Sequence, residues 1–259
     1  MVPTDELLIE DRGPARWITL NRPDRLNAIA PDGWDGVQEA FEAFEASEQQ
    51  VMVLTGSGRG FCAGADLTPT DISHLVEGGG VETMKTVGRA AQALHDVSKP
   101  TIAAVNGVAA GAGMNMALGC DIVLGSPDAR FTEVFVRRGL TVDFGGSFYL
   151  PRHVGLQRAK ELSMTGRVVD AQEALRIGLL LEIVEDLPTR AQELAETVAA
   201  NAPLGLASVK ANMNASFQRT LGEALEAEGA AQVVCFGSSD MAEGVAAFGE
   251  KRSPRFTGA

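Results

Sequence analysis

Short apolar runs alternate with amphipathic segments along the first two thirds of the chain. The runs VMVLT (51–55), TIAAV (101–105) and DIVLG (121–125) have the length and β-branched content of buried strands. Between these runs, apolar residues recur every three or four positions, which is the helical period. The two clearest stripes are Trp34, Val37, Phe41 and Phe44, and then Val81, Met84, Val87, Ala91 and Leu94. This alternation predicts an α/β fold with a mostly parallel sheet.

The two ends of the chain have different patterns. LLIEDRG (7–13) and ARWITLN (15–21) predict a hairpin, whereas residues from about 188 to 250 show helical patterns alone. Three capping boxes are predicted where a cap residue precedes a glutamate by three positions, at Asp170, Thr220 and Asp240. We therefore expect an α/β core over residues 1–190 and a helical region over 191–259. Those amphipathic helices need a surface to bury against, either their own core or a neighbouring subunit.

The stretch from Pro100 to Cys120 carries no charge and is long enough for a membrane span. It contains Pro100, Asn106, Asn115 and several glycines, which a span of this kind disfavours. A buried strand, a glycine turn and a helix from about Gly113 to Leu118 are expected instead, and no membrane association.

Composition narrows the function classes. The chain has 259 residues, and its 22 Lys and Arg against 34 Asp and Glu give a net charge of −12. A broad nucleic-acid surface is disfavoured because phosphate contacts need clustered cations, but a small phosphate-bearing ligand needs only a few. The three cysteines are far apart in sequence, and the N-terminus lacks a signal-peptide pattern. A reducing cytoplasm is therefore expected.

Several common chemistries lack their sequence patterns. The glycine loop GSGRG (56–60) has neither the dinucleotide nor the P-loop spacing. The three histidines are isolated from one another and from cysteine, so no zinc site is expected, and there is no GxSxG element. Nothing in the chain predicts a metal or a bound cofactor.

Two glycine-rich loops follow predicted strands, at residues 61–67 and 106–115. Small residues let a backbone approach a ligand closely, and N–H groups from two loops can converge on one oxygen. A helix starting near Gly113 would direct its positive end to the same point. The alternative is that small residues merely allow tight packing of strand against helix.

At these loops the chain resembles the crotonase superfamily, the enoyl-CoA hydratase/isomerase family. The matching stretches follow in order along almost the whole chain. They are NRPDRLNA (21–28), GRGFCAGADL (58–67), KPTIAAVNGVAAGAG (99–113), CDIVLGSPDARF (120–131), LPRHVG (150–155), TGRVVDAQEALRIGLL (165–180) and FGEKRSPRF (248–256). The resemblance implies a spiral of ββα turns, a C-terminal helical trimerisation region, and a homotrimer or a dimer of trimers.

The resemblance also implies a site for an acyl-CoA thioester, with coenzyme A entering as part of the substrate rather than as a cofactor. It places two oxyanion-hole donors on the backbone N–H groups of Ala63 and Ala112. It places the CoA along the loop and beside a few cations, with segments 68–90 and 132–148 as the expected pocket walls. The implied CoA-binding residues are Arg25, Ala63, Gly64, Ala65, Asp66 and Leu67, with Arg22 and Arg59 as further cations and Lys251 reaching over from a neighbouring subunit.

The carboxylates expected of a hydratase are missing from the family's positions. One position holds Asn115, which can only hydrogen-bond, and the other holds Phe135, which dries the pocket or belongs to the core. A third acidic position is filled by Asp143, within the pattern GLTVDFGGSFYLPRHVGL (139–156). This pattern resembles the 1,2-epoxyphenylacetyl-CoA isomerase and enoyl-CoA isomerase branch. Asp143 is the expected base, with a turn or helix-cap role as its alternative, and Glu133 is a weaker substitute.

Three functions follow as hypotheses. The first is a CoA-thioester isomerase, of double bonds or of epoxyphenylacetyl-CoA, which works through a stabilised enolate and one carboxylate base. The second is an enoyl-CoA hydratase of fatty-acid β-oxidation, and the third is a catalytically inactive acyl-CoA binder. RNA binding, which one branch of the superfamily performs with a basic first helix, is disfavoured because that helix here carries Glu39, Glu42, Glu45 and Glu48.

Overall fold

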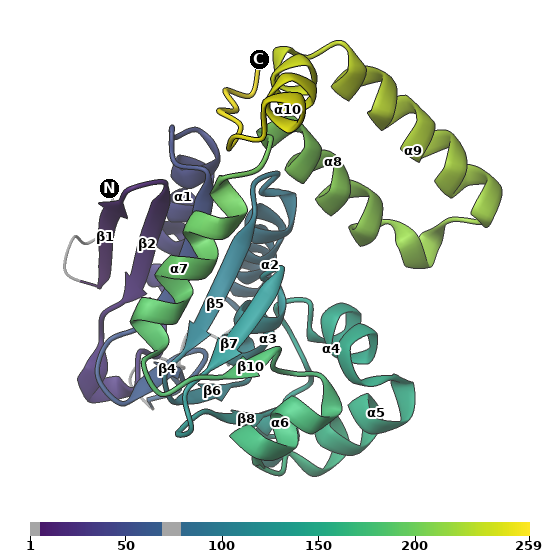
Figure 1. Ribbon diagram of the computed structural model, residues 1–259. Coiled ribbons are helices and arrows are strands. Elements are labelled where there is room, and N and C mark those ends of the chain that lie inside the picture. Colours follow the sequence, from purple (N-terminus) through teal and green to yellow (C-terminus); the bar gives the residue numbers. More distant parts are fainter. Residues whose placement is uncertain (1–5, 69–78) are drawn as a thin grey trace.

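The computed structural model describes residues 6–68 and 79–259, and its larger sheet has six strands (Figure 1). The order is β1 (Leu7–Arg12), β2 (Ala15–Leu20), β3 (Val51–Gly56), β5 (Thr101–Val105), β7 (Ile122–Gly125) and β10 (Glu182–Ile183). The first two strands form the predicted antiparallel hairpin, and the remaining pairs are parallel. The predicted strands 51–55, 101–105 and 121–125 are thus confirmed. Part of the expected pocket wall 68–90 lies outside the described residues.

A smaller sheet receives the chain after each inner strand of the larger one. Its order is β4 (Gly60–Cys62), β6 (Val108–Ala110), β8 (Arg130–Thr132) and β9 (Val169–Asp170). Strand β3 leads to β4, β5 to β6, and β7 to β8, so the chain repeats one turn three times. This repetition is the spiral core that the resemblance implies, and it brings the loops after β4 and β6 side by side because these strands pair in parallel.

Helices cover both faces of the larger sheet. The helices of the core are α1 (Gly33–Glu45), α2 (Gly80–Asp96), α3 (Ala112–Leu118), α4 (Gly146–Val154), α5 (Leu156–Thr165) and α6 (Ala171–Ile177), with short 3₁₀ turns η1 (Pro23–Arg25) and η3 (Val134–Arg138). All four apolar residues of the first predicted stripe are buried in or beside α1. Of the second stripe, Val87 and Leu94 are buried, but Val81 and Met84 are exposed because α2 begins beyond the core.

Helix α7 (Leu187–Ala199) covers the opposite face of the larger sheet. It therefore belongs to the core, and the separate C-terminal helical region is shorter than the expected 191–259. Leu187, Ala191 and Ala195 of α7 join a buried cluster with Trp17 and Val53 of the sheet. The expected boundary between residues 190 and 191 therefore falls inside a core helix. The extension begins later, with α8 (Pro203–Asn214), η4 (Ser216–Gln218), α9 (Leu221–Phe236) and α10 (Ser239–Glu250), and it projects from the core in Figure 1.

The predicted helix caps are correct at two positions and wrong at the third. Thr220 forms a complete capping box with Glu223, and Asp170 accepts a hydrogen bond from the Glu173 N–H. Asp240 is not a cap: α10 begins two residues earlier, where Ser238 accepts from the Met241 N–H. Asp240 is instead buried and accepts hydrogen bonds from the backbone of residues 257 and 258, tying the C-terminal segment to α10.

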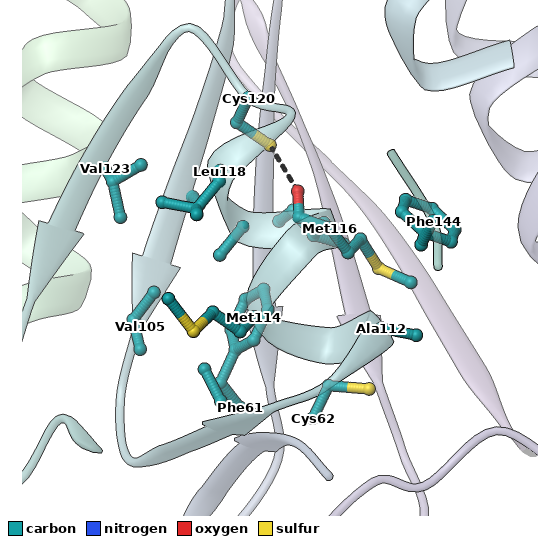
Figure 2. Packing of buried hydrophobic residues seen from close by; sticks show 14 of the residues in the cluster. Phe61, Cys62, Val105, Ala112, Met114, Met116, Leu118, Cys120, Val123 and Phe144 are labelled. Carbon is teal, nitrogen blue, oxygen red and sulfur yellow. Dashed lines mark hydrogen bonds between the residues drawn. The ribbon is translucent and has the colours of Figure 1, made fainter. Parts of the chain in front are cut away.

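The uncharged stretch from Pro100 to Cys120 forms β5, β6 and α3, as expected. Every residue of α3 is buried, and Figure 2 shows this helix enclosed by Phe61, Cys62 and Val105. Within the described ranges, none of the helices combines the length and the apolar character needed to cross a membrane. The glycine loop before α3 is thereby fixed at the centre of the core.

Candidate active site

The loops after β4 and β6 are held against each other by glycines that leave no room for a side chain. Gly64 has a φ of 87°, and a Cβ there would lie 2.8 Å from the Ala110 carbonyl oxygen and 3.4 Å from the Ala112 nitrogen. A Cβ on Gly113 would overlap the Cys62 carbonyl. Glycine is required at these positions because the two backbones touch. The two loops therefore lie against each other, as both the ligand-binding and the packing interpretations of their small residues require.

The structure assigns the N–H group of Ala63 to the fold rather than to a ligand. Ala63 N–H donates to the Leu26 carbonyl oxygen at 2.9 Å, so it is not free to bind a substrate oxygen. The expectation that Ala63 supplies an oxyanion-hole donor is therefore wrong. Its hydrogen bond ties the loop to the η1 turn instead.

Ala65, two residues further on, has the free N–H. Residue 65 forms an isolated parallel bridge with Ile29, in which Ile29 N–H donates to Gly64 and Asp66 N–H donates to Ile29. Those two bonds use the groups that face Ile29, so the Ala65 N–H points to the other side of the loop. It has no partner among the described residues. Ala112 is the first residue of α3, where backbone N–H groups have no intrahelical acceptor.

Asp143 lies at the start of α4 in a backbone conformation that is tightly held. Its carbonyl oxygen accepts from Gly146 N–H and from the Asn115 side-chain amide, both at 2.9 Å. The next two residues, Phe144 and Gly145, have positive φ angles of 47° and 76°. The Phe144 ring is buried against Trp34, and Figure 2 shows Met116 extending toward it. The main chain at Asp143 is therefore held on both sides, and this restricts where its carboxyl can lie.

The Asp143 side chain is half-buried, and one of its oxygens is enclosed without a hydrogen-bond partner among the described residues. Burial raises the pKa of this carboxyl to about 6. A carboxylate that is poorly solvated and unpaired is a stronger base than one in water. The helix-cap alternative is not supported, because the α4 N-cap is Gly145 and no side chain caps this helix. Asp143 does begin the turn that leads into α4, but it does so through its backbone carbonyl, and this leaves the carboxyl available.

Asn115 and Phe135 fill their predicted places beside the loops without supplying a carboxylate. Asn115 is fully buried on α3 and braces Asp143 through its amide. A Cβ on Gly111 would lie 3.2 Å from the Phe135 ring, so this ring packs on the backbone just before Ala112. Phe135 is buried, and it makes the approach to the Ala112 N–H apolar.

Glu133 is the residue that the sequence pattern undervalued. It precedes η3 and is fully buried, and neither of its carboxyl oxygens has a hydrogen-bond partner among the described residues. Burial raises its pKa to about 8, the nearby Asn115 amide offsets part of this shift, and the charge of Asp143 adds to it. The site therefore holds two carboxyl groups and not one. The signal in sequence was a charged residue directly after a buried strand, beside the predicted site.

Of the three cations expected to bind CoA, Arg22 has a structural role, whereas Arg25 and Arg59 are exposed. Arg22 donates to the Ala28 carbonyl at 2.6 Å and forms ion pairs with Glu6 and with the buried Asp66. Arg22 and Asp66 thus brace the loop from beneath. Arg25 and Arg59 are exposed on either side of the loop, while Leu67 is partly exposed at its end.

Asn27 fixes the turn that carries Arg25. It is buried with a φ of 58°, and its side-chain amide donates to the Ser57 and Gly60 carbonyls at 2.9 and 2.7 Å. The η1 turn and the loop before β4 are thereby joined into one unit. Lys251 is exposed at the end of α10, which Figure 1 shows at the opposite end of the molecule from β4 and β6. Lys251 is therefore remote from the site of its own chain.

A hollow of about 500 Å³ lies elsewhere, between α4 and the helical extension. Tyr149, Arg152, Lys210 and Phe217 are among its lining residues, and it includes neither carboxyl nor glycine loop of the site. The chemistry-bearing residues are thus gathered at the paired loops and at the start of α4.

The spiral core and its paired glycine loops define a crotonase-type protein. A family model described as enoyl-CoA hydratase/isomerase matches residues 15–259, and the chain belongs to this family. It is 38% identical to a 1,2-epoxyphenylacetyl-CoA isomerase of Escherichia coli over 93% of this chain and 94% of that protein. It is 37% identical to a short-chain-enoyl-CoA hydratase of Clostridium acetobutylicum over 96% of both chains.

Solved structures agree with this membership. An enoyl-CoA hydratase from Bacillus anthracis superposes with a TM-score of 0.93 at 30% identity, covering 98% of this chain and 100% of that one. A putative enoyl-CoA hydratase from Streptomyces coelicolor gives a TM-score of 0.92 at 34% identity, covering 100% of this chain and 97% of that one. The fold expected from the resemblance is confirmed, and relatives with both reaction types are similar to this chain.

Proposed function

We propose that this protein is an isomerase of acyl-CoA thioesters that moves a double bond, or rearranges an epoxyphenylacetyl-CoA, through an enolate. In the double-bond reaction, Asp143 takes a proton from the acyl chain, and the electron pair of the broken C–H bond moves into the thioester. The enolate then regains a proton at another carbon. Because no water is added, this reaction requires no carboxylate dedicated to activating water.

Asp143 carries the proposal. Its main-chain carbonyl is held by Gly146 and Asn115, and one of its carboxyl oxygens has no partner among the described residues. The pKa of the carboxyl is raised to about 6, so it is ionised and basic near neutral pH. The positions from which a hydratase would use two carboxylates hold Asn115 and Phe135. Similarity to a 1,2-epoxyphenylacetyl-CoA isomerase also supports this direction.

The enolate oxygen is proposed to bind between the N–H groups of Ala65 and Ala112. Both belong to the touching loops, and both are free of protein partners in the described part of the chain. Backbone donors aimed at a developing negative charge are worth about 3–4 kcal/mol each to the transition state. Ala65 thus takes the role that the resemblance gave to Ala63.

The CoA phosphates are proposed to lie near Arg25 and Arg59, the exposed cations beside the loop. We further propose that the subunits assemble into trimers or dimers of trimers through the helical extension. Helix α9 supports this assembly because its large apolar side chains are uncovered in the single chain. The exposed residues are Leu221, Leu225, Val233, Val234 and Phe236.

The decisive test is isomerisation of a 3-enoyl-CoA to the 2-enoyl form by the wild type and by Asp143→Asn. We expect the variant to lose about 10²–10⁴-fold in kcat, which is the range for a positioned base, while still binding the ligand. Asp128→Asn is the matched control because Asp128 is an exposed turn residue, and this variant should keep its rate. Equal rates for wild type and Asp143→Asn would reject the proposal.

Hydration is the second candidate, and Glu133 is the observation that favours it. Glu133 and Asp143 together give the site two carboxyl groups, which is the number a hydratase uses. Several relatives are also named hydratases. Incubation of crotonyl-CoA in ¹⁸O-labelled water distinguishes the two reactions. Rapid incorporation of label at C3 would favour the hydratase over the isomerase.

A further inference from the structure

Four of the five enclosed side-chain atoms without a hydrogen-bond partner, among the described residues, belong to one cluster. They are Oδ1 of Asn115, Oδ1 of Asp143 and both carboxyl oxygens of Glu133. The three residues come from α3, the turn before α4 and the segment before η3, and they are adjacent. Asn115 hydrogen-bonds to the Asp143 backbone, and both residues influence the pKa of Glu133: the Asn115 amide lowers it and the charge of Asp143 raises it.

This cluster consists of hydrogen-bond acceptors that lack a donor. A buried acceptor without a donor costs free energy, and a buried carboxylate without a cation costs more. No described ion pair involves Glu133. The two cations of η3, Arg137 and Arg138, are exposed, and Arg137 donates to the Thr165 carbonyl. A proton on Glu133 would remove the charge of this buried carboxyl and turn one of the four acceptors into a donor.

Glu133 and Asp143 are buried to different degrees, and their carboxyl groups therefore lose their protons at different pH values. Burial raises the pKa of Glu133 to about 8 and that of Asp143 to about 6. Near pH 7 the first group is therefore mostly protonated and the second mostly ionised. A pair of carboxyls divided in this way is the usual arrangement of an acid and its partner base. Asp143 is the titratable group acting on Glu133, and Glu161 on the neighbouring α5 is exposed and paired with Arg167.

We propose that Glu133 is a second proton-transfer residue of the site, a buried carboxylic acid that donates the proton that completes the reaction begun by Asp143. The inference rests on the proposed isomerase function. Asp143 takes a proton from one carbon, and the electron pair of that bond enters the enolate. The enolate then forms a bond to the Glu133 proton at the second carbon. Asp143 finally releases its proton to water and Glu133 takes a proton from water, so both groups return to their starting states and no proton is gained or lost.

A purely structural role explains the residue less well. Glutamine has nearly the same shape and carries its own donor without needing a proton. An apolar side chain of similar size would avoid burying a carboxyl group at all. The chain has neither at this position, and the group it does have can release a proton near neutral pH.

The test follows the fate of a substrate hydrogen in Glu133→Gln. With a 3-enoyl-CoA deuterated at C2, the wild type should place solvent hydrogen at the second carbon, because Glu133 supplies that proton. The variant should react about 10–100-fold more slowly and transfer more deuterium within the substrate, because Asp143 then serves both carbons. The loss of rate above a pH of about 8 should also disappear. Unchanged deuterium transfer and an unchanged pH profile would overturn the inference.

Infrared spectroscopy tests the protonation state without any turnover. At pH 7 the wild type should show the carbonyl band of a buried carboxylic acid, which Asp143→Asn retains and Glu133→Gln lacks. Glu48→Gln, in the exposed bend after α1, is the matched control and should leave the band unchanged. A missing band in the folded wild type overturns the inference whatever the reaction. A band in a wild type that moves no double bond overturns the proposed function and, with it, the transfer step.

Glu133→Met provides a variant that does not depend on a replacement hydrogen bond. Because the folded pKa of Glu133 is raised, its proton favours the folded state most below a pH of about 4.5, and this advantage is lost as the pH rises through about 8. We therefore expect Glu133→Met to raise the melting temperature more at pH 8 than at pH 5, and to lower kcat as Glu133→Gln does. A higher melting temperature with full activity and wild-type deuterium transfer would again overturn the inference.

Discussion

The side-chain amide of Asn115 donates a hydrogen bond of 2.9 Å to the backbone carbonyl of Asp143. The residue that occupies a family carboxylate position thus braces the backbone of a different carboxylate. Gly146 lies directly against this amide, where a Cβ would overlap it, so the contact is closely packed. The loss of one acidic group and the positioning of another are therefore parts of the same arrangement.

The rate of the proposed reaction should depend on the ionisation of Asp143. Because burial raises its pKa to about 6, the base is removed by protonation as the pH falls below that value. We expect kcat/KM to rise about tenfold per pH unit below 6 and to stay level from there to a pH of about 8, where Glu133 loses its proton. A pH–rate profile on a 3-enoyl-CoA measures this, and a profile that stays flat down to pH 5 would contradict the assignment.

Gly64→Ala should separate the two loops. The new Cβ would lie 2.8 Å from the Ala110 carbonyl oxygen, so Ala65 must move away from Ala112. The residue would also occupy a positive φ, which costs about 1–3 kcal/mol. We expect a loss of more than about tenfold in kcat, from the weakened oxyanion contact. Gly13→Ala carries a similar φ penalty at 56° in the turn between β1 and β2, where no atom lies within 4 Å of the new Cβ, so it should lower stability and retain kcat.

Arg22 and Arg25 should respond differently to substitution although three positions separate them. Arg22→Met removes contacts to Glu6, Ala28 and Asp66, and we expect it to destabilise the fold by about 1–3 kcal/mol. Arg25→Ala removes an exposed cation, so the melting temperature should stay constant while KM for the CoA ester rises about two- to fivefold. Added salt should reduce the Arg25 effect. Equal effects of the two substitutions on stability would contradict this division.

Helix α9 should control assembly. Leu225 is 57% exposed in the single chain, and a charge at its position would oppose burial of the α9 face. We expect Leu225→Glu to shift the mass measured by light scattering from a trimer or hexamer toward the monomer. Glu226→Gln, next to it on the same helix, should leave the mass unchanged. A wild type that is monomeric at micromolar concentration would contradict the proposal.

The sequence predicted the elements whose signal is local. Strand runs such as 101–105 and the stripe that ends at Phe44 need no partner to be recognised. The choice between Ala63 and Ala65 was not local, because it depends on a bridge to Ile29 that no spacing reveals. Asp240 matched a cap pattern, but its carboxyl binds backbone groups 17 and 18 residues away.

The acidic content of the site was also only partly predictable. Asp143 was identified from the resemblance, and its position at the loops agrees with that expectation. Glu133 is separated from Asn115 by 18 residues and from Asp143 by 10, so its burial arises only when three segments pack together. The sequence does not show how exposed a charged side chain is, and solvent exposure affects whether a carboxyl is ionised.

The hydrogen bond from Ala63 N–H to the Leu26 carbonyl fixes the η1 turn against the loop after β4, so the two segments have a set spacing. The η1 turn carries Arg25, where the nucleotide of CoA is proposed to bind. The loop after β4 carries Ala65, which would hold the thioester oxygen. Free energy released at the distant phosphates is then available to align the reacting carbonyl. A short thioester without the nucleotide would bind at the same oxygen site but would not be aligned in this way. The nucleotide of CoA is therefore expected to raise kcat as well as affinity.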